Sequence, residues 1–266
     1  MSLAIVECRG GRCVRMLANR KSCNLMHPMT TLGGSRAMLR TLALAALLLV
    51  SALPVAAGFK DGLASYQRGD YKTALREFKP LAEKGDAEAQ FHLGHMYRKG
   101  LGVPKNYPLA ASWFKKAAQQ GNPKAQHSLA LMYRSGRGVP RNHALAVDWY
   151  RKAAQHGLAK AQFRLGVMYR RGLGTPKDYA LAARWYKKAA EQGYVYAQNN
   201  LGTLYVRGHG VPRDYTIAYM WYSLVTASGS KMAVKSLKNI EKQMTPAQIA
   251  KAQEMAAKWK PKKAKR

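Results

Sequence analysis

The chain has 266 residues, of which 47% are hydrophobic. This is enough to bury a core, and it excludes disorder of the chain as a whole. The formal net charge is +32 at pH 7, from 45 Lys and Arg against 13 Asp and Glu. Such a surface favours polyanionic partners but does not indicate a fold.

Residues 38–57, MLRTLALAALLLVSALPVAA, have the order of a secretory signal peptide. Arg40 supplies a positive charge, an apolar run follows, and small residues end the segment at Ala57. The apolar run is shorter than the roughly 18 to 20 residues of a membrane-spanning helix. We therefore expect cleavage near Ala57, a periplasmic or secreted protein, and no transmembrane helix in the mature chain. An uncleaved anchor is the alternative.

Residues 1–37 form a polar segment in front of this signal. It holds all three cysteines of the chain, Cys8, Cys13 and Cys23. These cysteines lack the second pair that a zinc site needs. Because a signal peptide does not usually follow a polar stretch, we interpret residues 1–37 as a non-native or disordered extension, with translation starting at Met38 or Met29. The mature chain would then contain no disulfide and no cysteine for lipid attachment.

A repeat of 36 residues occupies residues 87–229. Four registers recur through four copies without an insertion: Gln90, Gln126, Gln162 and Gln198; Tyr97, Tyr133, Tyr169 and Tyr205; Pro104, Pro140, Pro176 and Pro212; and Trp113, Trp149, Trp185 and Trp221. Self-similarity at a fixed period of this length is the signature of a stacked repeat architecture.

Each copy is predicted to contain two helices. In the first copy, residues 89–97 and 109–118 carry apolar stripes at helical spacing, and Gly100, Gly102 and Pro104 interrupt the helix between them. A small residue recurs in the middle of the first helix and predicts close helix approach: Gly94, Ala130, Gly166 and Gly202. One helix pair cannot bury its stripe alone, so the copies must stack, and the Trp and Tyr registers are interpreted as core between repeats.

This pattern resembles the Sel1-like repeat family, a relative of the tetratricopeptide repeat. The residues that carry the resemblance are AQFHLGHMYRKGLGVPKNYPLAASWFKKAAQQG, at 89–121, and their three successors. The resemblance covers residues 87–229 closely, and residues 58–86 look like a shorter tetratricopeptide-type unit. It implies an all-α, right-handed α-solenoid of about five helix–turn–helix repeats. The family resemblance also implies protein–protein contact, often as a scaffold in cell-envelope or signalling assemblies.

Residues 230–259 are expected to cap the end of the solenoid. The last repeat replaces its basic pair with Ser223 and Leu224, so its second helix is more apolar and needs a cover. Thr245, Pro246 and Gln248 are an N-cap, a first-turn proline and a capping-box partner, which together start a helix that ends near residue 259. Residues 260–266, KPKKAKR, are expected to be a disordered basic tail.

The sequence predicts no catalytic site, no cofactor and no metal. The acids are scattered, and no nucleophile signature or phosphate-binding glycine loop is present. His92 and His95 lie on one helical face, but the other histidines do not share a repeat column with them, so we do not expect a metal there. We predict a protein that is not an enzyme. A hydrolase with a dispersed site is a weaker alternative.

Lys and Arg also recur at the repeat spacing, and they are the candidate partner-binding residues. They form one column at the end of the first helix, one in the turns and one of pairs on the second helix: Arg98, Arg134 and Arg170; Lys105, Arg141, Lys177 and Arg213; and Lys115, Lys116, Arg151, Lys152, Lys187 and Lys188. Stacking would turn each column into a ridge. A solvated face and a polyanion-binding surface are both open interpretations.

Two functions are compatible with these observations. The first is a protein–protein interaction scaffold of the bacterial envelope that holds a partner on its concave face, with modest salt dependence, and the net charge favours an acidic partner. The alternative is an electrostatic binder of anionic polysaccharide or lipid head groups, with steep salt dependence. Secretion disfavours nucleic acid, and the tail offers only Trp259 for stacking on bases.

Overall fold

The computed structural model describes residues 8–9, 12–13 and 58–262, and the chain divides into two units, Met1–Leu53 and Pro54–Arg266. In the first unit, the strands β1 (Cys8–Arg9) and β2 (Arg12–Cys13) pair in antiparallel register. The sequence does not predict this pair of strands. The predicted signal peptide at 38–57 lies outside the described residues, as do most of the predicted extension and residues 263–266.

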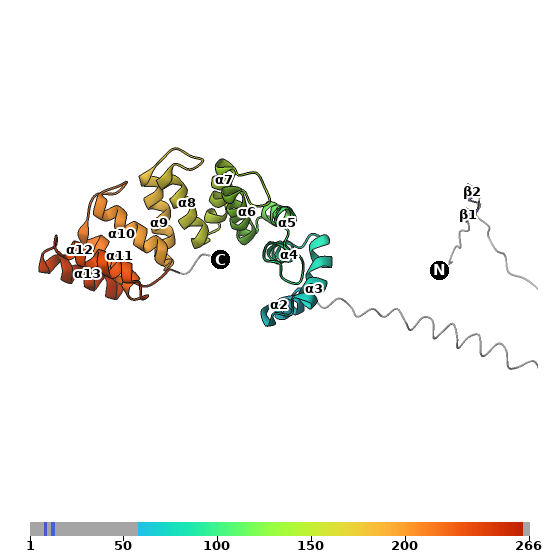
Figure 1. Ribbon diagram of the computed structural model, residues 1–266, viewed down its shortest axis with the longest axis horizontal. Helices are drawn as coiled ribbons and strands as arrows, with labels where there is room; N and C mark the ends of the chain where they lie inside the picture. Colours follow the sequence, from blue (N-terminus) through green and yellow to red (C-terminus); the bar gives the residue numbers. More distant parts are fainter. Residues whose placement is uncertain (1–7, 10–11, 14–57, 263–266) are drawn as a thin grey trace, which may run out of the picture. The chain divides into compact units, whose positions relative to one another are not determined.

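The second unit is an α-solenoid built from consecutive helix pairs (Figure 1). Within residues 58–262 its twelve helices are α2 (Phe59–Arg68), α3 (Tyr71–Glu83), α4 (Ala87–Lys99), α5 (Tyr107–Gln119), α6 (Pro123–Ser135), α7 (His143–Gln155), α8 (Ala159–Arg171), α9 (Tyr179–Glu191), α10 (Val195–Arg207), α11 (Tyr215–Thr226), α12 (Lys231–Glu241) and α13 (Pro246–Lys258). Each of α2 to α11 packs against the next helix in the chain, and α12 and α13 pack against α11. The predicted fold class, five helix pairs with a C-terminal cap, is confirmed.

The second helix of every 36-residue repeat begins at a side-chain cap. The caps are Asn106, Asn142, Asp178 and Asp214, and each accepts a hydrogen bond from the backbone N–H three residues later. Such caps satisfy a backbone donor that the first turn leaves open. The two acids among them therefore serve the helix ends.

Close approach of the two helices within a repeat explains the small mid-helix residue. A Cβ atom on Gly166 would lie 2.7 Å from the ring of Tyr186, and one on Gly94 would lie 2.9 Å from the ring of Phe114. Real Cβ atoms do not approach other atoms this closely, so in these two repeats the aromatic ring of the second helix requires glycine opposite it, whereas the second repeat has Ala130 at this place. This confirms the close approach predicted from the repeat.

The second glycine of each interhelical turn makes the contact between repeats. Gly174 has a φ of +69°, and a Cβ atom there would lie 2.2 Å from the carbonyl carbon of His143, in the preceding repeat. Gly138 and Gly210 make the same contact with Tyr107 and Tyr179. The turn of one repeat therefore packs directly on the backbone that starts the second helix of the repeat before it.

The repeated glutamine is also a contact between repeats. Its buried side-chain amide donates to a carbonyl oxygen near the end of the preceding second helix: Gln90 to Ala82 at 3.0 Å, Gln126 to Ala118 at 3.2 Å, Gln162 to Ala154 at 3.1 Å and Gln198 to Ala190 at 3.2 Å. A buried hydrogen bond of this kind fixes the register of one repeat on the next. The sequence showed the register of these glutamines but not this role.

The repeated aromatic residues also join neighbouring repeats. Tyr97, Tyr133 and Trp149 each pack against two adjoining hydrophobic clusters of the core. These rings lie where the stripe of one helix pair meets the next. This agrees with their interpretation as core between repeats.

The C-terminal helices cover the last helix pair. Thr245 caps α13 and forms a capping box with Gln248, and the helix ends before Trp259, whose ring meets that of Trp221 edge-on. The basic tail, expected to be disordered from residue 260, is held at Lys262. The backbone N–H of Lys262 donates to the carbonyl oxygen of Glu191 at 2.7 Å, and its ammonium lies 3.1 Å from the carboxylate of the same residue.

Candidate functional site

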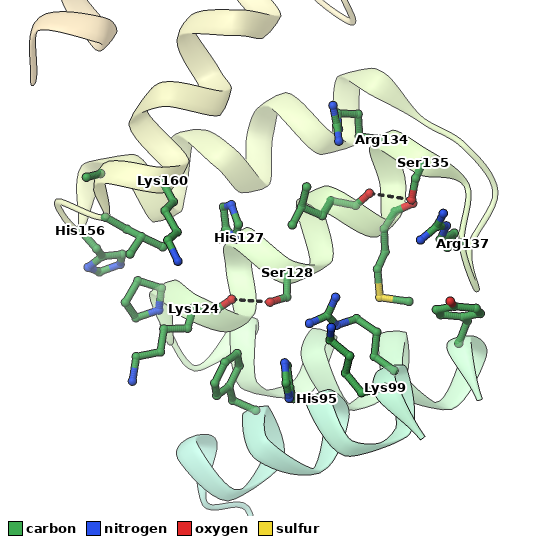
Figure 2. A pocket seen from close by; sticks show the side chains of 18 of the residues that line it. His95, Lys99, Lys124, His127, Ser128, Arg134, Ser135, Arg137, His156 and Lys160 are labelled. Carbon is green, nitrogen blue, oxygen red and sulfur yellow. Dashed lines mark hydrogen bonds between the residues drawn. The ribbon is translucent and has the colours of Figure 1, made fainter. Parts of the chain in front are cut away.

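A groove of about 1140 Å³ runs across the first helices of three successive repeats, α4, α6 and α8 (Figure 2). The helices α4, α6 and α8 and the turns beside them supply most of its lining. Because successive first helices lie at equivalent places in the repeat, side chains 36 residues apart enter the groove from neighbouring helices. The solenoid thus brings together residues that are far apart in the sequence.

The charged lining of the groove has one sign. Its seven cationic residues are Arg98, Lys99, Lys105, Lys124, Arg134, Arg137 and Lys160, and among the described residues no Asp or Glu lines it. Figure 2 shows five of them spread around the space: Lys99, Lys124, Arg134, Arg137 and Lys160. Lys124 comes within 3.8 Å of Glu88, but both side chains are exposed, and such pairs contribute little. Apolar side chains such as Phe91, Leu131 and Met132 complete the lining.

Unpartnered buried polar atoms are concentrated in one repeat. Across the described part of the chain, seven buried side-chain atoms have no hydrogen-bond partner, and five of them belong to residues 123–158. These five are Gln126 Oε1, His127 Nε2, Arg134 Nε, His143 Nδ1 and Tyr150 Oη. Buried polar atoms are normally paired, so a cluster of exceptions calls for a specific explanation.

Comparison of the repeats shows how the second one differs. At the same place in the first three repeats, a ring from the first helix packs on a ring from the second: Phe91 on Phe114 at 5.9 Å, His127 on Tyr150 at 5.7 Å, and Phe163 on Tyr186 at 5.7 Å between centroids. In the third repeat, Arg170 donates from Nε to the hydroxyl of Tyr186 at 3.3 Å. The equivalent atoms of Arg134 and Tyr150 make no hydrogen bond of normal geometry, although Arg134 lies close enough to Tyr150 to oppose the rise of its pKa.

A second substitution leaves Gln126 without a donor. In the neighbouring repeats, Gln120 donates to Gln90 Oε1 and Gln192 donates to Gln162 Oε1, each at 2.8 Å. Residue 156 occupies the equivalent place between these two pairs, and there the chain has an exposed histidine that lines the groove. The oxygen of Gln126 therefore has no partner.

Burial keeps His127 uncharged near neutral pH. It is the main reason why the pKa of this histidine is lowered to about 4, and four nearby cations act in the same direction: Arg164, Lys160, Arg134 and Arg98. A neutral imidazole carries one donor and one acceptor nitrogen, so His127 offers hydrogen bonding without adding charge. Figure 2 shows its ring and the side chain of Lys160 facing the same part of the groove.

Two further groups near the groove have shifted pKa values. Burial raises the pKa of Tyr150 to about 12, so its hydroxyl keeps its proton. Burial is also the main cause that lowers the pKa of His95 to about 4, and Arg98 and Lys99 add to it. The Nδ1 atom of His95 lies 2.6 Å from the hydroxyl of Tyr66, which holds the ring in place.

Of the thirteen residues predicted from the sequence, three line the groove: Arg98, Lys105 and Arg134. The pairs on the second helices do not line it. Their second members lie over the repeated tryptophans of their own helices: Lys116 over Trp113 at 4.3 Å, Lys152 over Trp149 at 4.4 Å and Lys188 over Trp185 at 4.6 Å. Lys115 and Lys187 are exposed.

The remaining predicted residues make local contacts. Arg151 forms an ion pair with Asp148 at 2.7 Å, and Arg170 donates to Tyr186. In the turns, Lys177 and Arg213 lie over the rings of Tyr179 and Tyr215, at 4.8 and 5.8 Å, and Arg141 is exposed. The three columns therefore do not meet in one site.

Sequence reasoning missed the other four cations of the groove, Lys99, Lys124, Arg137 and Lys160, and it also missed His127. Two signals could have found some of them. Lys124 and Lys160 are separated by one repeat, and His127 stands where the repeats before and after it have Phe91 and Phe163.

The structure gives His92 and His95 roles in packing. His92 stacks on Phe78 with the ring centroids 5.0 Å apart, and His95 binds Tyr66. In the described ranges, no three His, Cys, Asp or Glu residues come together as metal ligands would. Among the helices that the structure describes, none has the length and apolar character needed to cross a membrane.

The comparisons with known proteins give one consistent result. The Sel1 repeat model matches residues 87–122, 123–158, 159–194 and 195–229. A Sel1 repeat protein from Oxalobacter formigenes is 34% identical with a TM-score of 0.67, over 76% of this chain and 85% of that one. A protective antigen of uropathogenic Escherichia coli with an SLR fold is also 34% identical with a TM-score of 0.67, over 75% of this chain. The match spans only 44% of that antigen. No curated protein matches.

Proposed function

This chain belongs to the Sel1 repeat family, and from that premise we propose that it is a non-enzymatic scaffold of the bacterial envelope that binds a protein partner in the groove across α4, α6 and α8. The groove is the observation that carries the proposal. Its volume, about 1140 Å³, exceeds the roughly 300 to 1,000 Å³ of typical small-molecule sites. A lining of apolar side chains between cations suits a polypeptide segment.

The packing of the repeats supports a binding role. Buried glutamines and closely packed turn glycines fix each repeat on its neighbour, so the groove does not have to be assembled when a partner arrives. A surface that is already ordered loses less conformational entropy on binding. The residues repeated most strictly thus build a rigid frame, and the variable residues of the first helices give the groove its chemistry.

The envelope location is a proposal from the predicted signal peptide. In the structure, α2 begins at Phe59 with Gly58 as its N-cap, directly after the expected cleavage point near Ala57. Cleavage there would leave every helix of the solenoid intact. Fractionation of cells and N-terminal sequencing of the purified protein test this: we expect a periplasmic or secreted chain that starts near Gly58, and a cytoplasmic chain that retains residues 38–57 would contradict it.

A pull-down from envelope extract tests the proposed function. The protein is compared with a groove variant, Arg98→Gln with Lys124→Gln and Lys160→Gln, and with a control that loses the same number of charges from second helices, Lys115→Gln with Lys116→Gln and Lys187→Gln. We expect one stoichiometric protein that survives moderate salt, persists with the control and is lost with the groove variant. Equal recovery with all three baits would overturn the proposal.

Electrostatic binding of anionic envelope polymers or lipid head groups is the second candidate. Three lysines that lie over the repeated tryptophans of the second helices favour it, because they form a periodic cationic array away from the groove. This candidate predicts recovery of heterogeneous anionic material, lost in moderate salt because exposed charges are screened. It also predicts greater loss with a variant that removes these three lysines, Lys116→Gln with Lys152→Gln and Lys188→Gln, than with the groove variant.

A further inference from the structure

We propose that the second 36-residue repeat holds a carboxylate-binding subsite of the groove, formed by Arg134, His127 and Tyr150, which anchors an Asp or Glu side chain of an extended protein segment. This inference rests on the proposed function, since it specifies what the partner places in the groove. Arg134 and His127 line the groove, and Tyr150 lies directly behind the ring of His127.

The first argument is the set of unpartnered atoms. Arg134 Nε, His127 Nε2 and Tyr150 Oη are all buried and have no hydrogen-bond partner among the described residues. Burying polar atoms without partners is costly, and proteins keep such groups where another molecule supplies the missing bonds or a function needs them. Three such atoms at one place in one repeat are the observation on which the proposed site rests.

The second argument is that the fold does not require these polar groups. The first repeat builds the same ring contact from two phenylalanines, Phe91 and Phe114. The third repeat keeps the tyrosine but pairs it with its arginine, because Arg170 donates to Tyr186. The Nε atom of Arg98 in the first repeat is also without a partner, but only the second of these three repeats adds a polar ring from each helix beside such an arginine.

The third argument concerns the chemistry of the ligand. Arg98, Lys160 and Arg164 lie near enough to His127 to shift its titration, and no acidic residue lines the groove. An arginine fork matches the two oxygens of a carboxylate, and neutral His127 and protonated Tyr150 each have a hydrogen to donate. The side chain of Arg134 lies beside the hydroxyl of Tyr150 without a hydrogen bond of normal geometry, so it can move aside to admit the carboxylate to the atoms beneath it.

The shape and the apolar lining favour a protein segment over a lipid or polyphosphate. The site lies within a groove between helices, where the surface of a bilayer does not fit. Phe91, Leu131 and Met132 line the same groove and would contact apolar side chains, which polyphosphate lacks. An extended segment that alternates acidic and apolar residues satisfies both parts of the lining.

Fluorescence anisotropy with the full chain tests the subsite. The probe is a fluorescein-labelled octapeptide of alternating Glu and Ala, called the Glu peptide. The matched control peptide, called the Gln peptide, has Gln in place of every Glu. The variants are Arg134→Gln and the double change His127→Phe with Tyr150→Phe, which copies the pair present in the first repeat. The control is Lys115→Gln with Lys116→Gln and Lys187→Gln.

We expect the Glu peptide to bind and the Gln peptide to bind at least about tenfold more weakly. Arg134→Gln and the double variant should each lower the affinity about tenfold, whereas the control, which removes more charge, should change it by less than about threefold. The melting temperature of the double variant should equal or exceed that of the unchanged protein, because the change removes unpartnered buried polar atoms. Loss of affinity with an unchanged melting temperature separates a binding role from a structural one.

Several results would overturn the inference. One is that the double variant binds the Glu peptide as tightly as the unchanged protein does. Others are that the Glu and Gln peptides bind equally, or that the Glu peptide does not bind. The last is that phosphatidylglycerol vesicles or polyphosphate bind at the same site more tightly than the Glu peptide. The pull-down distinguishes this failure from failure of the proposed function. A partner lost with the groove variant but retained with His127→Phe and Tyr150→Phe keeps the proposed function and rejects the subsite.

Discussion

His127 shows how a single position can be both part of the fold and part of a site. It takes the place of Phe91 and Phe163 in the stack of rings between the two helices of a repeat. An imidazole keeps the packing of the ring and adds polar atoms, but burial then opposes its charged form. The substitution therefore has a cost that depends on pH, and this cost can be measured.

The first prediction concerns the pH dependence of stability. Because the pKa of His127 is about 4 in the folded chain and 6.5 is its ordinary value, the unfolded state binds the proton first as the pH falls. This histidine should therefore lower the free energy of unfolding below pH 6.5, by at most about 3 kcal/mol at pH 4, and have no effect at higher pH. His127→Phe should remove that part of the fall, as measured by urea denaturation at pH 7 and pH 4.

Tyr150→Phe is the control for this prediction, because it alters the same pair of rings but leaves His127 in place. Its stability should fall between pH 7 and pH 4 as much as that of the unchanged protein. If the stability of His127→Phe falls between pH 7 and pH 4 as much as that of Tyr150→Phe and of the unchanged protein, then the fold does not hold the histidine neutral.

At the scale of the elements, the turns decide whether helix pairs stack. Each interhelical turn places its second glycine against the backbone at the start of a second helix in the preceding repeat. Such a contact leaves no room for a side chain, so it sets the distance between neighbouring repeats. The glycine at the end of a second helix has no such neighbour, although its φ is also positive.

The second prediction compares these two kinds of glycine. Gly174→Ala should destabilise the solenoid by about 3 kcal/mol or more, because its Cβ would lie 2.2 Å from the carbonyl carbon of His143 and its φ is +69°. Gly121→Ala, with φ +90° and no atom within 4 Å of a Cβ, should cost only about 1 to 2 kcal/mol. Urea denaturation measures both, and equal losses would show that backbone angle alone makes these positions glycine.

The sequence predicted the elements well because each strictly repeated residue makes a contact that recurs in every copy. Gln162 and Gly174 illustrate this, since each fixes one helix or turn on a neighbour. The groove was predicted poorly for the opposite reason. Its chemistry comes from Lys124 and His127, at positions where the copies differ, and a search for what the repeats share passes over them.

At the scale of the whole molecule, the fold distributes the Lys and Arg side chains over separate surfaces. The columns of Lys and Arg found in the sequence divide between the groove, the turns and the tryptophan rings of the second helices. The residues that give the net charge of +32 therefore do not form one continuous cationic surface. The groove concentrates seven cations without an acid, and this local field, more than the total charge, would attract an acidic segment.

The third prediction concerns the end of the solenoid. Helix α11 buries Tyr219, Trp221 and Tyr222, and the helices α12 and α13 pack against it. A chain that ends at Ser230 should expose part of this apolar face and self-associate, because terminal repeats need a polar outer surface to stay soluble.

A chain that ends at Trp259 keeps both covering helices and loses only the tail contact with Glu191, which is an exposed ion pair and one backbone hydrogen bond. Size-exclusion chromatography should therefore show aggregates for the shorter chain and the unchanged elution volume for the longer one. If both elute like the unchanged protein, the repeats close their own end and α12 and α13 are free for another role.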